Sequence, residues 1–351
     1  MIYSILLAIL LISLVLLLVW QLLRWLPAGA DKLKPLPYVI ALLPIAPFCA
    51  GFGLIASAVA AVATRSQNEF YKSYVFLCVA YIVLFVISLK SYSPYFSRRL
   101  REQTQEKSLE IRVMTLNCRY GRANASQIIK IAKTHKIDTI LLQEVSEKLV
   151  KNLEKLGIER DFAHVQLGNA NDHENGGFNA IYTRLSNVKS FGKSIKIDAA
   201  NVPIVTAVAC DPAVSGDSSA ENLLITFASA HPKSPMRGCA AWCSGIMALA
   251  KIGENHNKSN VKKVTIIGGD LNSTPDHPSF RTLLKSGFLD ASMQIGKRLK
   301  TWPTWQKWPN LALDHVLVKS SGCIAKATEQ STIRVDGSDH FALIVCISIP
   351  L

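Results

Sequence analysis

Polar side chains that suit a hard cation and a phosphate ester occur in four short segments in the C-terminal two-thirds of the chain. Each segment lies at or just beyond the end of an apolar run that predicts a β-strand, where a sheet presents side chains to a ligand. Carboxylate, amide and imidazole groups gathered there suit Mg²⁺ or Mn²⁺ and a phosphoryl oxygen. The segments are Thr115-Leu116-Asn117, Leu142-Gln143-Glu144, Gly269-Asp270-Leu271-Asn272 and Ser338-Asp339-His340. The pattern indicates an enzyme.

The apolar patterning of residues 111–351 predicts strands with helices between only some of them, which favours a mixed, layered α/β domain. Helices are expected at 126–136, from Ser146 to before Gly157, and around 236–254. Strands are expected at 111–117, 138–143, 180–183, 203–210, 223–230, 264–268, 313–318 and 341–347.

Six motifs in this region resemble, in order, those of the endonuclease/exonuclease/phosphatase superfamily, which includes DNase I-like nucleases, abasic-site endonucleases, inositol polyphosphate phosphatases and bacterial sphingomyelinases. The resemblance implies a four-layered α/β/β/α sandwich with the site between two sheets. It also implies a metal-dependent hydrolase of phosphate esters. The motifs are Met114-Thr115-Leu116-Asn117, Leu142-Gln143-Glu144, Ala230-His231-Pro232, Gly268-Gly269-Asp270-Leu271-Asn272, Leu313-Asp314-His315-Val316 and Gly337-Ser338-Asp339-His340.

The resemblance implies a metal site and assigns three residues to it. Glu144 would hold the catalytic Mg²⁺ or Mn²⁺, and Asn117 would lie close by. Asp339 would complete the site as a ligand of the metal or of water.

The same resemblance assigns catalytic roles to five residues. Asp270 would orient or deprotonate the attacking water, and Asn272 would hold the scissile phosphate and the nucleophile. His340, polarised by Asp314, would stabilise charge on the phosphoryl oxygens, and His231 would bind phosphate. In-line displacement at phosphorus needs such charge neutralisation and positioning more than covalent chemistry.

Taken one at a time, these residues also have purely structural interpretations. Asp270 and Asn272 are ordinary turn residues, Asn117 and Glu144 suit strand-end caps, and His231 suits a hydrogen-bonded core position. Asp314 lies in an apolar run, where an unpaired carboxylate would be costly, and a partner such as His340 would remove that cost. His315, adjacent to Asp314 in a strand, should face the opposite side and is interpreted as structural.

The N-terminal region predicts membrane spans, because 49% of the residues are hydrophobic and the excess lies there. Residues 2–23, 38–64 and 73–89 contain no charged residue, and each approaches the roughly 20 residues that span a bilayer. We expect three spans in residues 1–90, a juxtamembrane linker at 91–110 and the enzyme domain at 111–351. This arrangement is similar to membrane-anchored bacterial members of the superfamily.

Two alternatives to this topology remain. The first run could be a signal peptide cleaved near Ala28-Gly29-Ala30, although no basic segment precedes it and it exceeds the length of a signal core. The third run could be a buried helix of a soluble protein. With three spans, seven membrane-proximal Lys and Arg residues fall on the side of the C-terminal domain and two on the other, which predicts a cytoplasmic domain. Two spans would reverse this orientation.

The sequence does not identify the substrate. Residues 111–351 contain 29 Lys and Arg against 20 Asp and Glu, a net charge of +9, which suits nucleic acid, anionic headgroups or a nearby anionic bilayer. Exposed tryptophans in 301–308 could stack on a base or enter a lipid interface, or pack in a loop. The function classes are therefore a nuclease-like phosphoesterase, a phospholipid-headgroup or phosphoinositide hydrolase (sphingomyelinase-like), and a catalytically silent membrane-bound binding module. No protein partner can be deduced, and the eight cysteines show no metal-binding spacing.

Overall fold

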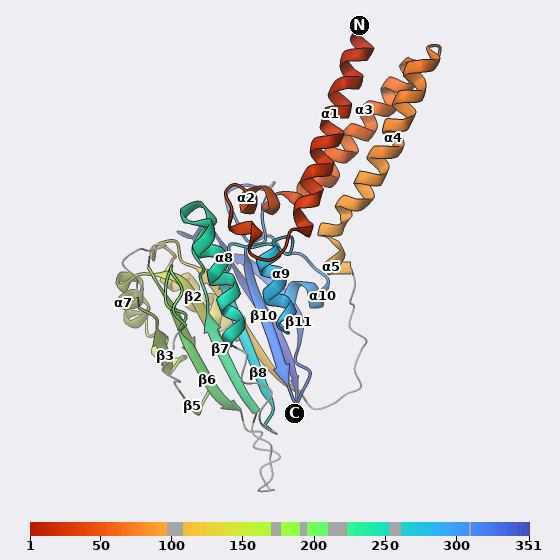
Figure 1. Ribbon diagram of the computed structural model, residues 1–351. Coiled ribbons are helices and arrows are strands. Elements are labelled where there is room, and N and C mark those ends of the chain that lie inside the picture. Colours follow the sequence, from red (N-terminus) through yellow and green to blue (C-terminus); the bar gives the residue numbers. More distant parts are fainter. Residues whose placement is uncertain (97–107, 170–176, 190–194, 210–222, 253–260, 309) are drawn as a thin grey trace. The chain divides into compact units, whose positions relative to one another are not determined.

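The computed structural model describes residues 1–96, 108–169, 177–189, 195–209, 223–252, 261–308 and 310–351 (Figure 1). The chain forms two compact units. The first comprises Met1–Pro94 with Pro275–Pro278, and the second comprises Tyr95–Thr274 with Ser279–Leu351. Most of the expected linker, and the ends of the strand expected at 203–210 and of the helix expected at 236–254, lie outside the described residues.

The first unit is helical. Three of its helical segments are long and apolar enough to cross a membrane, at Ile2–Trp25, Leu36–Ala63 and Glu69–Ser91. Its α-helices are α1 (Ile2–Leu22), α2 (Leu36–Ala41), α3 (Ala46–Ala63) and α4 (Asn68–Ser88). The short helix α5 (Ser93–Phe96) begins in this unit and ends in the second. Short 3₁₀ turns lie at Leu23–Trp25, Ala30–Lys32, Leu43–Ile45 and Leu89–Ser91.

Two tyrosines of α4 hold the long helices of this unit together. The Tyr74 and Tyr81 hydroxyls donate to the backbone carbonyls of Tyr3 (2.6 Å) and Leu10 (2.8 Å) in α1. A β-carbon at Gly53 in α3 would lie 2.2 Å from the Tyr81 ring, so this glycine allows α3 and α4 to approach closely.

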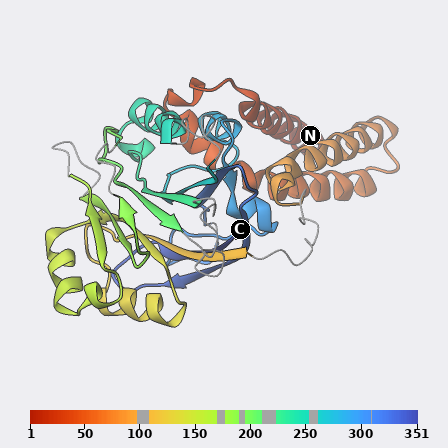
Figure 2. The ribbon, with the colours of Figure 1, turned by 90° about the horizontal axis from the view of Figure 1, so that it is seen from below.

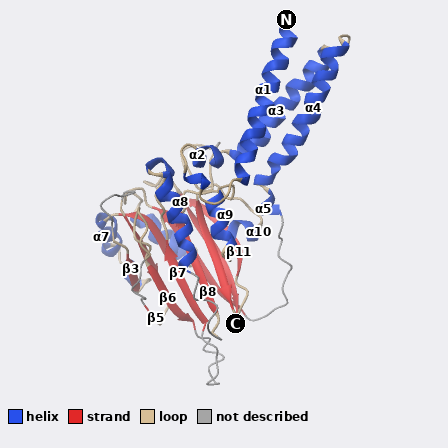
Figure 3. Cartoon of the chain, viewed as in Figure 1, coloured by secondary structure: helices blue, strands red, loops and turns tan. Residues whose placement is uncertain are grey.

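The second unit contains two six-stranded mixed sheets, whose strands are drawn in red in Figure 3. The first sheet contains β1 (Ser108–Asn117), β2 (Thr139–Val145), β3 (His164–Leu167), β4 (Phe178–Thr183), β11 (Lys326–Arg334) and β12 (Phe341–Pro350). The second contains β5 (Val188–Lys189), β6 (Ile204–Ala209), β7 (Leu223–Ser229), β8 (Lys263–Asp270), β9 (Leu289–Asp290) and β10 (Asp314–Ser321). Their strand orders are β11-β12-β1-β2-β4-β3 and β5-β6-β7-β8-β10-β9. A parallel pair lies within each sheet, β1 with β2 and β7 with β8, and the other neighbours are antiparallel.

The sheets face each other across an apolar core to which both contribute, for example Val113 and Leu141 from one and Phe227 and Ile266 from the other. Helices cover the two outer faces (Figure 2). One face packs against α6 (Ala125–Thr134) and α7 (Glu147–Lys155), and the other against α8 (Cys239–Ala248) and α9 (Pro278–Lys285). The short helix α10 (Ala291–Ile295) and 3₁₀ turns at Ile158–Arg160 and Pro235–Arg237 complete the unit. The expected four-layered α/β/β/α sandwich is confirmed.

Local sequence explains where several helices begin. The Asn124 side chain accepts from the backbone nitrogens of Ser126 and Gln127, and the Ser146 hydroxyl accepts from that of Leu149. These are N-caps, which satisfy amide groups that a helix leaves unpaired. The α8 helix is shorter than expected because Pro235–Arg237 forms a 3₁₀ turn before it.

Candidate active site

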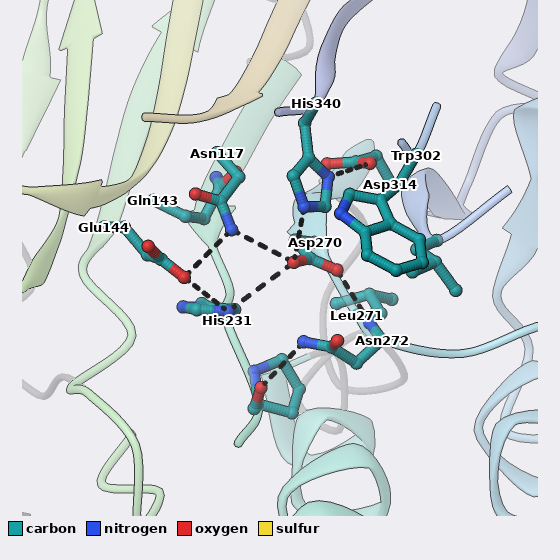
Figure 4. Close-up of polar contacts among 12 residues, drawn as sticks. Asn117, Gln143, Glu144, His231, Asp270, Leu271, Asn272, Trp302, Asp314 and His340 are labelled. Atoms are coloured by element: carbon teal, nitrogen blue, oxygen red, sulfur yellow. Dashed lines mark hydrogen bonds and ion pairs between the residues drawn. The ribbon is translucent and has the colours of Figure 1, made fainter. Parts of the chain in front are cut away.

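Six side chains of the second unit meet where strands of the two sheets end (Figure 4). From the first sheet come Asn117 at the end of β1, Glu144 in β2 and His340 just before β12. The second contributes Asp270 at the end of β8, Asp314 at the start of β10, and His231 just after β7; Asp270 and Asp314 are cross-strand partners.

The Asn117 amide links the two sheets. Its nitrogen lies 3.2 Å from Glu144 Oε1 and 3.1 Å from Asp270 Oδ2, and its oxygen accepts from the backbone nitrogen of Arg119 at 2.9 Å. The contact with Arg119 fixes which end of the amide faces the carboxylates. A neutral donor therefore holds two buried carboxylates together.

A backbone irregularity directs Glu144 into this group. The pairing of β2 with β4 shifts between Leu142 and Val145, and Glu144 has a φ of 51°. A bulge of this kind re-aims a side chain. The strand thus continues beyond Gln143, where the sequence placed its end, and Glu144 faces Asn117.

Close backbone packing brings His231 to the same place. A β-carbon at Gly269 would lie 1.8 Å from the Ala230 carbonyl oxygen, so only glycine permits this approach. His231 Nε2 then lies 3.6 Å from Asp270 Oδ2 and 3.8 Å from Glu144 Oε1. Burial and the nearby positive charge of His340 lower the pKa of His231 to about 3, so this imidazole is neutral at neutral pH.

His340 and Asp314 form a buried pair. His340 Nδ1 lies 2.8 Å from Asp314 Oδ2, and His340 Nε2 lies 3.5 Å from Asp270 Oδ2. Burial by itself lowers the pKa of His340, but the carboxylates of Asp314 and Asp270 outweigh it and raise that pKa to about 10. For Asp314, burial raises the pKa, and the His340 cation outweighs it, so the net shift is downward. The pair is an imidazolium with a carboxylate at neutral pH.

Glu144 and Asp270 carry raised pKa values. Burial is the main cause for Glu144, whose pKa rises to about 7, and the charge of Asp270 adds to it. Burial also raises the pKa of Asp270, against the lowering effect of His340. Both carboxylates would therefore gain from a nearby cation.

A divalent metal ion would compensate these buried negative charges, and the donor atoms nearby fit such an ion. Glu144 and Asp270 present oxygen atoms to one side of Asn117, and hard cations prefer such ligands. Ligand atoms of Asp270, Asp314 and His340 also lie within 4.8 Å of one another. The hydrogen bond between His340 and Asp314 already occupies part of that second group.

Asn272 and Asp339 lie at the margin of the group. The backbone nitrogen of Asn272 donates to Asp270 Oδ1 at 2.9 Å, and its amide nitrogen lies 3.4 Å from the Pro232 carbonyl oxygen. The Asp339 carboxylate lies 3.9 Å from the Arg119 guanidinium and accepts from the Trp302 indole at 3.4 Å. Among the described contacts, Asp339 has none with Glu144 or Asn117, so the structure does not join the three proposed metal ligands.

The sequence did not identify several residues that position the site. The Ser338 hydroxyl donates to the Asn117 carbonyl at 2.6 Å and accepts from the His340 backbone nitrogen at 3.0 Å. The Thr301 hydroxyl accepts from the backbone nitrogens of Leu313 and Asp314. Small hydroxyl residues carry no distinctive sequence signal: Ser338 stands inside the Gly337-Ser338-Asp339-His340 motif, but the motif gave it no role.

His315 faces away from the site, as the alternation of β10 predicts, but it contacts the segment that follows Asp270. Its Nδ1 atom lies 2.6 Å from Asp290 Oδ2, and its Nε2 atom lies 3.0 Å from the Ser273 carbonyl oxygen. The imidazole therefore anchors the segment that follows Asp270-Leu271-Asn272.

Comparison with known proteins agrees with this geometry. Residues 114–340 match the model of the endonuclease/exonuclease/phosphatase family. The chain belongs to that family. It is accordingly a hydrolase of phosphate esters. A search of curated proteins found no match.

Three solved structures to which this chain is similar share little sequence with it. A humanized Danio rerio TDP2 shares 17% identity and superposes with a TM-score of 0.52, over 68% of this chain and 98% of that one. A family member from Bacteroides thetaiotaomicron shares 14% identity (TM-score 0.48; 70% and 100% covered). A mannosyl-6-phosphatase from the same organism shares 15% (TM-score 0.46; 68% and 99% covered).

Proposed function

We propose that this protein is a membrane-anchored phosphoesterase that requires Mg²⁺ or Mn²⁺ and hydrolyses its substrate by in-line attack of water. The observation that carries the proposal is the contact chain Glu144–Asn117–Asp270–His340–Asp314, which joins both sheets. Three apolar helical segments of sufficient length support the membrane anchor.

Within this proposal Asp270 is the general base. Its carboxylate is buried and has a raised pKa, and a base whose pKa lies near the working pH transfers protons efficiently. The donation from the Asn272 backbone nitrogen to Oδ1 orients the group. Oδ2 then faces the side where water and phosphate would lie, and Asn272 would hold the phosphate.

His340 stabilises negative charge on the phosphoryl oxygens. Its imidazolium is preformed because Asp314 holds the Nδ1 proton, so little reorganisation accompanies the reaction. His231, neutral and fully buried, donates one hydrogen bond to phosphate. A metal ion bound by Glu144, with Asn117 close by, would polarise the phosphoryl group and neutralise its charge. Asp339, whose described contacts are with Arg119 and Trp302, would act through water.

A panel of phosphate esters tests the proposal on the full-length protein in detergent micelles. It comprises single-stranded DNA, RNA, a phosphoinositide, sphingomyelin, bis(p-nitrophenyl) phosphate and p-nitrophenyl phosphate, each with Mg²⁺, Mn²⁺ or EDTA. We expect metal-dependent turnover of at least one, abolished by Asp270→Asn. Lack of turnover on every substrate would favour a catalytically silent binding module. Preference for the two lipids would identify a headgroup hydrolase, which an anchor in the bilayer also favours.

A further inference from the structure

The loop after β1 has a strained backbone that the site holds in place. Arg119, Tyr120 and Gly121 have φ values of 46°, 55° and 69°, and such angles are unfavourable for the two non-glycine residues. The backbone nitrogen of Arg119 donates to Asn117 Oδ1 at 2.9 Å, and that of Tyr120 donates to Glu144 Oε2 at 3.0 Å. Two residues with long side chains are therefore fixed directly beside the site carboxylates.

The Tyr120 ring gathers two arginines from different segments. The guanidinium carbons of Arg122 and Arg237 each lie 5.7 Å from the ring centroid, a distance typical of cation–π contacts. Arg237, in the 3₁₀ turn before α8, also donates to the Tyr120 hydroxyl. All three side chains are exposed, Tyr120 by 43%, so a ligand can reach them.

Two guanidinium groups thus lie at one exposed aromatic ring beside the site. Arg119, in the same loop as Tyr120 and Arg122, carries a third positive charge, and its guanidinium lies 3.9 Å from the Asp339 carboxylate. The charge of Arg237 reaches the site itself: after burial and His340, it contributes to the lowered pKa of His231. A guanidinium group can donate two parallel hydrogen bonds to the oxygen atoms of one phosphate group.

We propose that Arg122 and Arg237, held by Tyr120 and assisted by Arg119, bind a second phosphate group of the substrate beside the one that is cleaved. This inference rests on the proposed phosphoesterase function. It narrows the substrate class to molecules that carry at least two phosphates, such as a nucleotide chain or a headgroup with two phosphates. An isolated monophosphate ester would use only the catalytic half of the site.

Binding measurements in EDTA, where no turnover is expected, test the subsite separately from catalysis. Isothermal titration of the full-length protein in detergent would compare thymidine 3′,5′-bisphosphate with thymidine 5′-monophosphate, and inositol 1,4-bisphosphate with inositol 1-phosphate. For at least one pair we expect the bisphosphate to bind about tenfold more tightly, because the second phosphate gains charge-assisted hydrogen bonds from the arginines. The pair with the larger ratio identifies the source of the second phosphate.

The decisive variant is Arg122→Gln/Arg237→Gln, in which the ratio should fall to about two or less. The matched control is Lys130→Gln/Lys151→Gln, which removes the same charge from the exposed faces of α6 and α7 and should keep the ratio. Ratios near one for both pairs in the wild type, or equal losses in the two double variants, would overturn the inference. A ratio that behaves as expected, in a protein that hydrolyses nothing in the panel, would support the subsite and refute the proposed catalysis.

Discussion

His340 Nδ1 and Asp314 Oδ2 lie 2.8 Å apart, in a pair with almost no solvent exposure. The two residues come from different sheets, and each shifts the other's pKa toward the charged form. They should therefore act as one unit, because the imidazolium depends on its carboxylate for both orientation and charge.

We expect Asp314→Asn and His340→Gln each to lower kcat by roughly two to three orders of magnitude. The double variant should lose little more than the worse single one, since residues that act together are not additive. The control is a cycle that pairs Asp314→Asn with Asp138→Asn. The Asp138 carboxylate pairs with Arg184 and accepts from the Arg112 backbone nitrogen, so there the losses should add. Simple addition for the His340 pair would separate the two roles.

The same pair predicts a pH dependence of stability. The pKa of His340 is about 10 in the folded protein and about 6.5 when unfolded. The contribution of the protonated His340 to the free energy of unfolding is therefore complete below about pH 6.5, and it decreases as the pH rises toward 10. Thermal unfolding in EDTA should show a difference between wild type and His340→Gln that is larger at pH 7 than at pH 9.5. A constant difference would mean that His340 is not protonated in the folded state.

Glu144→Gln tests the metal site. The change removes the charge and keeps only one of the two hydrogen bonds that the carboxylate accepts, from Asn117 Nδ2 and from the Tyr120 backbone nitrogen. The metal concentration for half-maximal activity should rise about tenfold or more. The unfolding temperature should change little, because removal of a charge that burial disfavours offsets the lost hydrogen bond. Glu147→Gln, exposed at the start of α7, is the matched control. Wild-type activity of Glu144→Gln at low Mg²⁺ would remove this residue from the site.

Orientation of the enzyme domain is a separate prediction. Membrane-proximal Lys and Arg residues number seven on the side of this domain and two on the other, which favours a cytoplasmic location. An epitope after Leu351 should resist protease in intact cells and be lost after permeabilisation. Digestion in intact cells would place the domain outside.

The strands that carry Asn117, Asp270 and Asp314 could be predicted because apolar runs end at polar motifs, and the motif order indicated the family. Contacts between the motifs could not be derived from local pattern: Asn117 and Asp270 are 153 residues apart. Strand β11 was missed because its side chains are mostly polar and part-exposed. The positive φ angles of Arg119 and Tyr120 could not be predicted, because neither position is a glycine.

The prediction for His315 was incomplete. Strand alternation placed its side chain on the face of β10 opposite to Asp314, but it did not indicate the partners of the imidazole. Both ring nitrogens face acceptors, the Asp290 carboxylate and the Ser273 carbonyl, so the imidazole must carry both protons to satisfy them. Burial lowers its pKa, and Asp290 outweighs this effect, so the net shift is upward. The contact with Ser273 fixes the segment that follows Asn272.

Loss of this anchor should displace Asp270 and Asn272 without removing a group that touches substrate. We expect His315→Gln to lower kcat about tenfold, since small misplacements are costly in catalysis. The metal concentration for half-maximal activity should rise much less than in Glu144→Gln, because the Glu144 carboxylate stays in place. This difference separates a positioning role from loss of a metal ligand. The control for loss of a histidine is His135→Gln, because His135 lies at the end of α6, far from His315 in the sequence. Unaltered kcat in a folded His315→Gln protein would show that Asp290 and Ser273 hold the loop without the imidazole.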